Sequence, residues 1–333
     1  MRRLLVIMAY KTTDALMRHL RQQGIQISGS TQKRQLINTG YYHGYKGYRF
    51  YKDAQHRLPF ISYDEIYATI QYDAKLKALF YDKIMFLETA IKNISLTCIL
   101  KSANSENIQD MYDKVITSYK NAPAGSSAEI RQQFQNNKLS LQSRIHSYIA
   151  KAYKNNDPKI THFYSNSKYS SVPLWALFEI IMMGDFGFLL SCLNYSTRDM
   201  ISKEIGLNLA VDANRELIYK YLYILKELRN AIAHNDVIFD TRFRHMNPSK
   251  ATKRCLELSI NLNYVNFKSI GDYIILVCYY LKLLKIPKQD IVSFIDTFLQ
   301  LTNEYKKSVN SQVAHMVINP DWTSRMTRLE KFL

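Results

Sequence analysis

The chain has 333 residues, of which 47% are hydrophobic and 22% charged, proportions ordinary for a folded soluble protein. Lysine and arginine number 45 against 28 acidic residues, and the resulting net charge of +17 favours a polyanionic or acidic partner, most commonly nucleic acid. Four scattered cysteines without a CxxC pair argue against a zinc ribbon or a disulfide framework and fit a reducing cytosol.

Two apolar stretches are candidates for a targeting or membrane segment. The N-terminal MRRLLVIMAYK holds only about six apolar residues before Lys11, fewer than a signal-peptide core needs. The run at 273–285 ends in lysines well before the ~20 residues of a membrane span. A cytoplasmic protein without membrane contact is therefore expected.

Helical periodicity dominates the first half of the chain. Helices are predicted at 13–23 and 31–39, each stopped by a glycine. Ser62 and Glu65 have capping-box spacing and open a long helical tract that runs to about residue 101. A break at 121–129 precedes another predicted helix, which ends near residue 154.

The second half begins with SVPLWALFEIIMMGDFGFLL (171–190), which is apolar nearly all round until Gly184. Pro173 stands at a favoured first helical position, so one central helix is expected here, with Trp175 in the core. Apolar residues at spacings of three and four predict a helix at 218–232. The remaining predicted elements are a basic loop at 241–250, helices at about 269–285 and 288–306, and a short tail.

These elements predict an all-α fold in three parts. The parts are a small helical and tyrosine-rich N-terminal segment packed on the bundle (1–61), a helical bundle (62–245) and a C-terminal helical extension (246–333).

Polar groups gather in LRNAIAHND (228–236), near the end of the predicted 218–232 helix. Histidine exchanges protons near neutral pH, arginine offers a fixed fork of donors to phosphate oxygens, and an amide can orient a hydroxyl or water. Arg229, Asn230 and His234 are therefore candidates for metal-free RNA cleavage, in which a ribose 2′-OH loses its proton and attacks the adjacent phosphate.

The spacing of this motif leaves alternatives open. Asn230 and His234 share a helix face, whereas Arg229 and His234 are about 140° apart on a regular helix and do not converge. Either the helix ends near His234 and frees the imidazole, or a second copy supplies the missing partner across a two-fold axis. In a purely structural interpretation, Arg and His favour the helix dipole and bond its last carbonyls.

Four stretches, INTGYYHGYKGYRFY (37–51), YDAKLKALFYDKIMFLETAIKN (72–93), VPLWALFEIIMMGDFG (172–187) and LKELRNAIAHND (225–236), resemble the Abi-like abortive-infection proteins of bacteria. That family is a branch of the HEPN superfamily of helical, often dimeric, ribonucleases. The resemblance implies an HEPN-like bundle whose R-x4–6-H signature falls on Arg229 and His234, with Asn230 as the polar residue after the arginine.

The resemblance also implies a function. It implies a homodimeric, metal-independent endoribonuclease without a cofactor, which acts on RNA as a toxin in phage defence or a toxin–antitoxin system. A toxin needs restraint, and a chain at +17 suits a structured non-coding RNA or an acidic protein as antitoxin.

A second candidate region is the Tyr-rich segment, GYYHGYKGYRFYKDAQHR (40–57). Its tyrosines recur every third residue among cations, and Lys46 and Arg49 are candidate ligands of single-stranded RNA. The alternative, slightly favoured, is a compact turn packed on the bundle. The tyrosines in question are Tyr42, Tyr45, Tyr48 and Tyr51.

Other polar residues are assigned weaker roles. Glu179 lies in an apolar stretch, where a buried carboxylate needs a partner, so it is expected to hold Arg229 or a backbone amide or to be a satisfied core group. Arg242 and Arg244, with His245, extend an RNA path or form a solvated loop. The histidines show no metal-ligand spacing, so no metal site is predicted.

Two other functions remain open. One is a catalytically silent HEPN-type module that binds RNA or protein through its basic surface. The other is a basic helical adaptor without a nucleic-acid role, which salt-dependent RNA binding would exclude.

Overall fold

The computed structural model describes residues 12–166 and 171–333, so the N-terminal MRRLLVIMAYK lies outside the described residues. In these two ranges the regular secondary structure is helical, and strand-like pairing is limited to isolated bridges, which confirms the all-α prediction. The first half contains α1 (Thr13–Gln22), α2 (Gly29–Thr39), the π-helix η1 (Gly40–Lys46), α3 (Tyr63–Ala103), α4 (Ile108–Lys114), α5 (Ala128–Lys154) and α6 (Pro158–Ser165). The second half contains α7 (Leu174–Ile180), α8 (Met183–Cys192), α9 (Tyr195–Ile205), the 3₁₀ turn η2 (Leu209–Val211), α10 (Leu217–Ala233), α11 (Lys250–Ile260), α12 (Ile270–Leu283), α13 (Lys288–Ser308), α14 (Ser311–Val317) and α15 (Trp322–Phe332).

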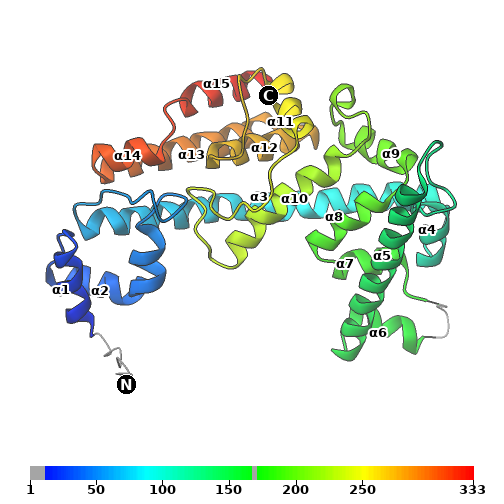
Figure 1. Ribbon diagram of the computed structural model, residues 1–333, viewed down its shortest axis with the longest axis horizontal. Coiled ribbons are helices and arrows are strands. Elements are labelled where there is room, and N and C mark those ends of the chain that lie inside the picture. The colour runs from blue at the N-terminus through cyan, green and yellow to red at the C-terminus, as the bar shows by residue number, and fades with distance from the viewer. Residues whose placement is uncertain (1–11, 167–170) are drawn as a thin grey trace, which may run out of the picture.

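The long helix α3 crosses the molecule and the other helices pack around it (Figure 1). The predicted capping box fixes its start, because Ser62 and Glu65 each accept the other's backbone N–H at 3.4 Å. Its 41 residues span roughly 60 Å. α13 packs along it, where the rings of Tyr72 and Tyr305 stack at 4.5 Å. The helix α3 therefore packs against elements from both the early and the late parts of the chain.

The predicted N-terminal helices are confirmed, and both end at the expected glycines. Gly24 and Gly40 have φ values of 80° and 74°, a region that glycine enters without a Cβ clash. α2 continues into the π-helix η1, and both lie at one end of α3 (Figure 1). The N-terminal helices thus hold the Tyr-rich segment against the bundle.

The single helix predicted over 171–190 is wrong, because α7 and α8 are separate there. Ile181 is extended between them (φ −69°, ψ 130°), and its carbonyl accepts a hydrogen bond from Lys92 of α3 at 2.8 Å. A tertiary contact therefore satisfies a carbonyl that a continuous helix would have used itself. Trp175 is also not a core residue, since it is 42% exposed and its indole N–H donates to Glu106 at 3.2 Å.

The helices predicted near 269–285 and 288–306 are confirmed as α12 and α13, but the sequence after them is more ordered than the expected short tail. It forms α14 and α15, and α15 is tied to α12 by an ion pair between buried Arg325 and buried Asp272. Trp322 also donates to Ser269 at 2.8 Å. Buried residues from all three predicted parts belong to one hydrophobic core. The boundaries at 61 and 245 stay a prediction.

Candidate functional site

The site is built on the last turns of α10. Leu222, Leu225 and Leu228 are fully buried on its inner face. The outer face carries Lys226 and Asn230, four residues apart and both half-buried. An apolar stripe thus fixes which polar side chains point outward.

α10 ends at the motif histidine. His234 is the C-cap, and Asn235 follows in the left-handed conformation (φ 57°), which asparagine tolerates better than most residues. The Asp236 N–H bonds the Ala231 carbonyl at 2.8 Å and the Asn235 N–H bonds Ile232 at 3.2 Å, a Schellman pattern. Backbone N–H groups therefore donate to the last carbonyls of α10, and the His234 side chain is not needed for this. The exposed His234 imidazole makes no hydrogen bond to any described residue.

Arg229 is held by an acidic residue of α3. Its Nε lies 3.5 Å from the Glu88 carboxylate, and its Nη1 donates to Asn230 at 3.3 Å. Glu88 is 9% exposed and also pairs with Lys92 at 3.0 Å. The Arg229 Nε is itself buried without a well-directed hydrogen bond. The guanidinium is thus oriented by charge and keeps donor capacity for another ligand.

The expectation that Glu179 is buried is wrong. Its side chain is 61% exposed and lies 3.7 Å from Lys159, on the outward face of α7. Glu88 has the expected position beside Arg229 instead. Its signal in the sequence is a glutamate within the apolar stripe of the long helix, with Lys92 four residues later.

A pocket of about 440 Å³, the α5–α10 pocket, opens between α5, α8 and α10. Its basic side chains are Arg144 from α5 and Lys226 and Arg229 from α10. Asp185 is its acidic residue, and it accepts hydrogen bonds from Arg144 and from the Tyr148 hydroxyl, both at 2.5 Å. The other lining residues are Met182, Met183, Gly184, Phe188, Tyr223 and Asn230. Cations exceed acids in this pocket, so its chemistry suits an anion.

A second pocket of about 570 Å³ lies between α10 and the segment that follows it, residues 236–246. Lys226 and Asn230 line both pockets, whereas Arg229 lines only the α5–α10 pocket. Buried Glu227 shapes the second pocket by accepting the backbone N–H groups of residues 245 and 246 at 3.2 and 3.1 Å. His234 lines neither pocket. Neither of these two pockets therefore brings Arg229 and His234 of one chain together.

Comparison with known proteins gives one result for this architecture. A sequence model of the family described as Abi-like protein matches residues 34–240, more than half of the chain. The chain belongs to the Abi-like protein family. No curated protein and no solved structure matches it.

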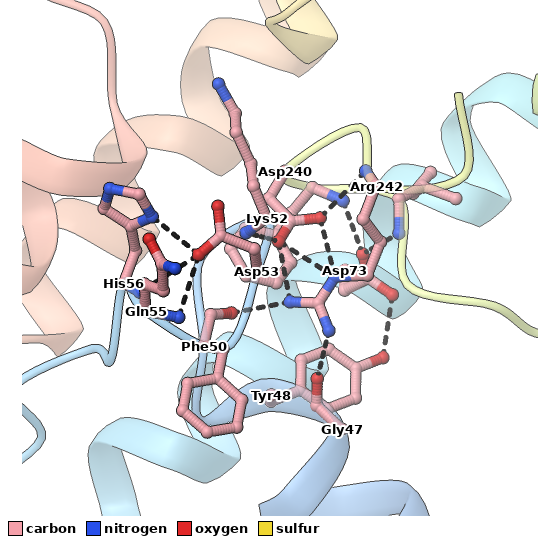
Figure 2. Close-up of polar contacts among 12 residues, drawn as sticks. Gly47, Tyr48, Phe50, Lys52, Asp53, Gln55, His56, Asp73, Asp240 and Arg242 are labelled. Atoms are coloured by element: carbon pink, nitrogen blue, oxygen red, sulfur yellow. Dashed lines mark hydrogen bonds and ion pairs between the residues drawn. The ribbon is translucent and has the colours of Figure 1, made fainter. Parts of the chain in front are cut away.

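The matched region of the Abi-like protein contains a buried polar network that anchors the residues after His234. Asp73 of α3 is fully buried; one carboxylate oxygen accepts the Ile238 and Phe239 N–H groups, both at 2.8 Å. Its other oxygen accepts the Tyr48 hydroxyl at 2.8 Å (Figure 2) and pairs with Lys77 at 2.9 Å.

The same network reaches the residue next to the motif histidine. Lys77 donates to the Asn235 side chain at 2.8 Å, and the Asn235 amide lies 3.2 Å from the His43 ring. α3, the Tyr-rich segment and the end of α10 are thus bonded to one another at the position of His234.

Arg242 links two of these parts of the Abi-like protein, the Tyr-rich segment and the loop after α10 (Figure 2). It pairs with fully buried Asp240 at 2.6 Å and donates to the carbonyls of Gly47 and Phe50 at 2.7 and 2.6 Å. All three nitrogens of its guanidinium donate within the protein. The predicted RNA ligand is thus already engaged in holding the Tyr-rich segment on the loop after α10.

The other candidate RNA ligands differ in exposure: Lys46 is exposed, whereas Arg49 and Arg244 are half-buried. Lys46 is exposed, with its ammonium 4.5 Å from the ring of exposed Tyr42. Arg49 lies over the Phe50 ring at 4.4 Å, and Arg244 approaches Asn247 at 3.5 Å. The slightly favoured packing role holds for Tyr45 and Tyr48, each 1% exposed.

No group of three or more His, Cys, Asp or Glu side chains is arranged to hold a metal ion within residues 12–166 and 171–333. None of the helices in these ranges is long and apolar enough to cross a bilayer.

Proposed function

We propose that this Abi-like protein is a metal-independent endoribonuclease, the growth-arresting toxin of a bacterial abortive-infection or toxin–antitoxin system, with an HEPN-type active site. The observation that carries the proposal is the last turn of α10. It presents Arg229 and Asn230 to a basic pocket and leaves the His234 imidazole exposed at the helix end. Family membership and the net charge of +17 support the same assignment.

In the proposed reaction, the His234 imidazole removes the proton of a ribose 2′-OH. The 2′ oxygen forms a bond to the adjacent phosphorus while the bond from phosphorus to the 5′ oxygen breaks. The Arg229 guanidinium stabilises the charge on the phosphate oxygens, and Asn230 orients the hydroxyl. The 5′ oxygen gains a proton from water, and the His234 imidazolium returns its proton to the solvent, so the products are a 2′,3′-cyclic phosphate and a 5′-OH.

A homodimer is part of the proposal. The two motif residues are about 140° apart on a regular helix and His234 lines neither pocket, so we propose that a second copy, and not the freed end of α10, brings a histidine to the Arg229 pocket. A structured RNA or an acidic protein is proposed as antitoxin, because either would neutralise the excess of cations.

Cleavage of a labelled RNA in excess EDTA tests the chemistry. His234→Ala and Arg229→Ala should each abolish cleavage with little loss of thermal stability, because neither side chain is fully buried. Asn230→Ala should be milder. His315→Ala and Arg254→Ala are matched controls at exposed sites on α14 and α11 and should cleave normally. Cleavage that depends on Mg²⁺ would refute the mechanism, and RNA protection without cleavage would favour a silent RNA-binding module.

Light scattering and mixing test the dimer. RNA-free protein should have about twice the 39.0 kDa chain mass. Mixing the two inactive variants should restore part of the activity if each site takes Arg229 from one chain and His234 from the other. A strict monomer that still cleaves RNA would refute the composite site.

A further inference from the structure

We infer that the α5–α10 pocket binds a phosphate of the RNA strand through Arg144 and Lys226, at a position beside the phosphate that is cleaved. The inference rests on the proposed function and assigns two residues outside the R-x4-H motif to substrate binding.

The first step is the charge of the pocket. Arg144, Lys226 and Arg229 face it; Asp185 pairs with Arg144 and Glu88 lies beside Arg229, so Lys226 is the basic lining residue that has no acidic partner among the described residues. Lys226 is half-buried and makes no ion pair or hydrogen bond with a described residue. Its ammonium lies 5.7 Å from the centre of the Tyr223 ring. A cation in that position is available to an external anion.

The second step is the preparation of Arg144. Its guanidinium lies 4.5 Å from the centre of the Phe188 ring, and its Nη1 donates to Asp185. Asp185 is fixed in turn by Tyr148. Asp185 therefore fixes one nitrogen of the Arg144 guanidinium, Nη1, while Nε and Nη2 make no hydrogen bond within the described residues. A stacked, oriented guanidinium with free donors fits phosphate oxygens and loses little side-chain entropy on binding.

The third step is position. Lys226, Asn230 and His234 follow one another at four-residue spacing along α10, so about 12 Å of helix separates Lys226 from His234. Asn230 lines the pocket between them. In the composite site the attacked phosphate lies at Arg229, three residues along α10 from Lys226, so the phosphate held by Lys226 and Arg144 is the next one in the strand. The apolar lining, Phe188, Tyr223 and Met182, offers contact to a neighbouring base.

The test uses His234→Ala protein, which cannot cut, and a fluorescein-labelled single-stranded RNA. Anisotropy titrations at several salt concentrations compare Lys226→Met and Arg144→Gln with the controls Lys203→Met and Arg254→Gln. Both control residues are more than half exposed and lie outside the pocket. Each pocket variant should weaken binding about tenfold and reduce the magnitude of the salt slope by about 0.7, the value for one lost phosphate contact on a single strand. The controls should change neither.

Pocket variants that bind like the controls, with an unchanged slope, would overturn the inference while wild-type cleavage continued to support the proposed function. Absence of both RNA binding and cleavage in the wild type would overturn the two together. In the otherwise active chain, the pocket variants should raise KM more than they lower kcat, because the contact is made before and during the reaction alike. Unchanged melting temperatures would show that the variants are folded.

Discussion

The substitution Asp73→Asn tests how much the buried pair of Asp73 and Lys77, beside the end of α10, stabilises the fold. Asparagine keeps one acceptor oxygen for the Ile238 and Phe239 N–H groups, but places an NH₂ where the second oxygen faces Tyr48 and Lys77. The Tyr48 hydroxyl can turn and accept from this amide. The Lys77 ammonium has no acceptor to offer, so it is left without its anion.

The magnitude follows from burial. The side chains of Lys77 and Asp73 are 10% and 0% exposed, and removing one partner of a buried ion pair costs about 3–5 kcal/mol. Lys77 keeps its bond to Asn235, which places the expected loss in the free energy of unfolding near 3 kcal/mol. Lys77→Met should cost about 1.5 kcal/mol, because Asp73 keeps three neutral donors. The double variant should lose less than the sum, since it buries no unpaired charge.

Urea unfolding followed by circular dichroism measures these free energies. Lys75→Met is the matched control on the same helix, because the Lys75–Glu304 pair is about half exposed and is worth at most about 1 kcal/mol. Equal losses for Lys75→Met and Lys77→Met, or strictly additive losses for the double variant, would refute the argument that Asp73 and Lys77 act as a buried pair.

Three further predictions concern packing, thiols and the Tyr-rich segment. Gly187→Ala should lower the free energy of unfolding by about 1–3 kcal/mol, because the added Cβ would lie 2.9 Å from the Tyr223 ring. Gly184→Ala should be neutral or stabilising, because its Cβ would lie 3.4 Å from the flexible side chain of Lys226. Equal effects on the melting temperature would contradict the close approach of α8 and α10. The four cysteines should react with a thiol reagent at pH 8 only after unfolding, because all are buried and burial raises the pKa of the Cys192 thiol to about 11, which leaves little thiolate; rapid labelling of native protein would contradict this. Arg242→Met should make the Tyr-rich segment cleavable by trypsin in the folded protein, and an unchanged digestion pattern would show that the segment is held by other contacts.

Local signals predicted the helices whose ends are decided by neighbouring residues. The Ser62–Glu65 capping box and the glycines after α1 and α2 satisfy or release backbone groups within a few residues, so tertiary packing does not change their effect. The relation between Arg229 and His234 is local too, because five residues of a regular helix separate two side chains by about 140° whatever packs around them.

The composition of the site depends on contacts distant in sequence. Glu88, not Glu179, lies beside Arg229, because α3 passes under α10 while Glu179 faces solvent. Arg144 reaches the same pocket from α5. No periodicity within α3 or α5 indicates which helix each will meet, so these partners follow from the packing of the helices.

The helical class, the long central helix and the polar motif at the end of α10 follow from the sequence, because apolar periodicity and caps act over one to three turns. The tertiary structure decided the break between α7 and α8, where Lys92 takes the Ile181 carbonyl. It also decided the role of Arg242, whose donors meet carbonyls nearly two hundred residues earlier in the chain. Long-range hydrogen bonds of this kind form only once the core has brought their partners together, so no local sequence pattern predicts them.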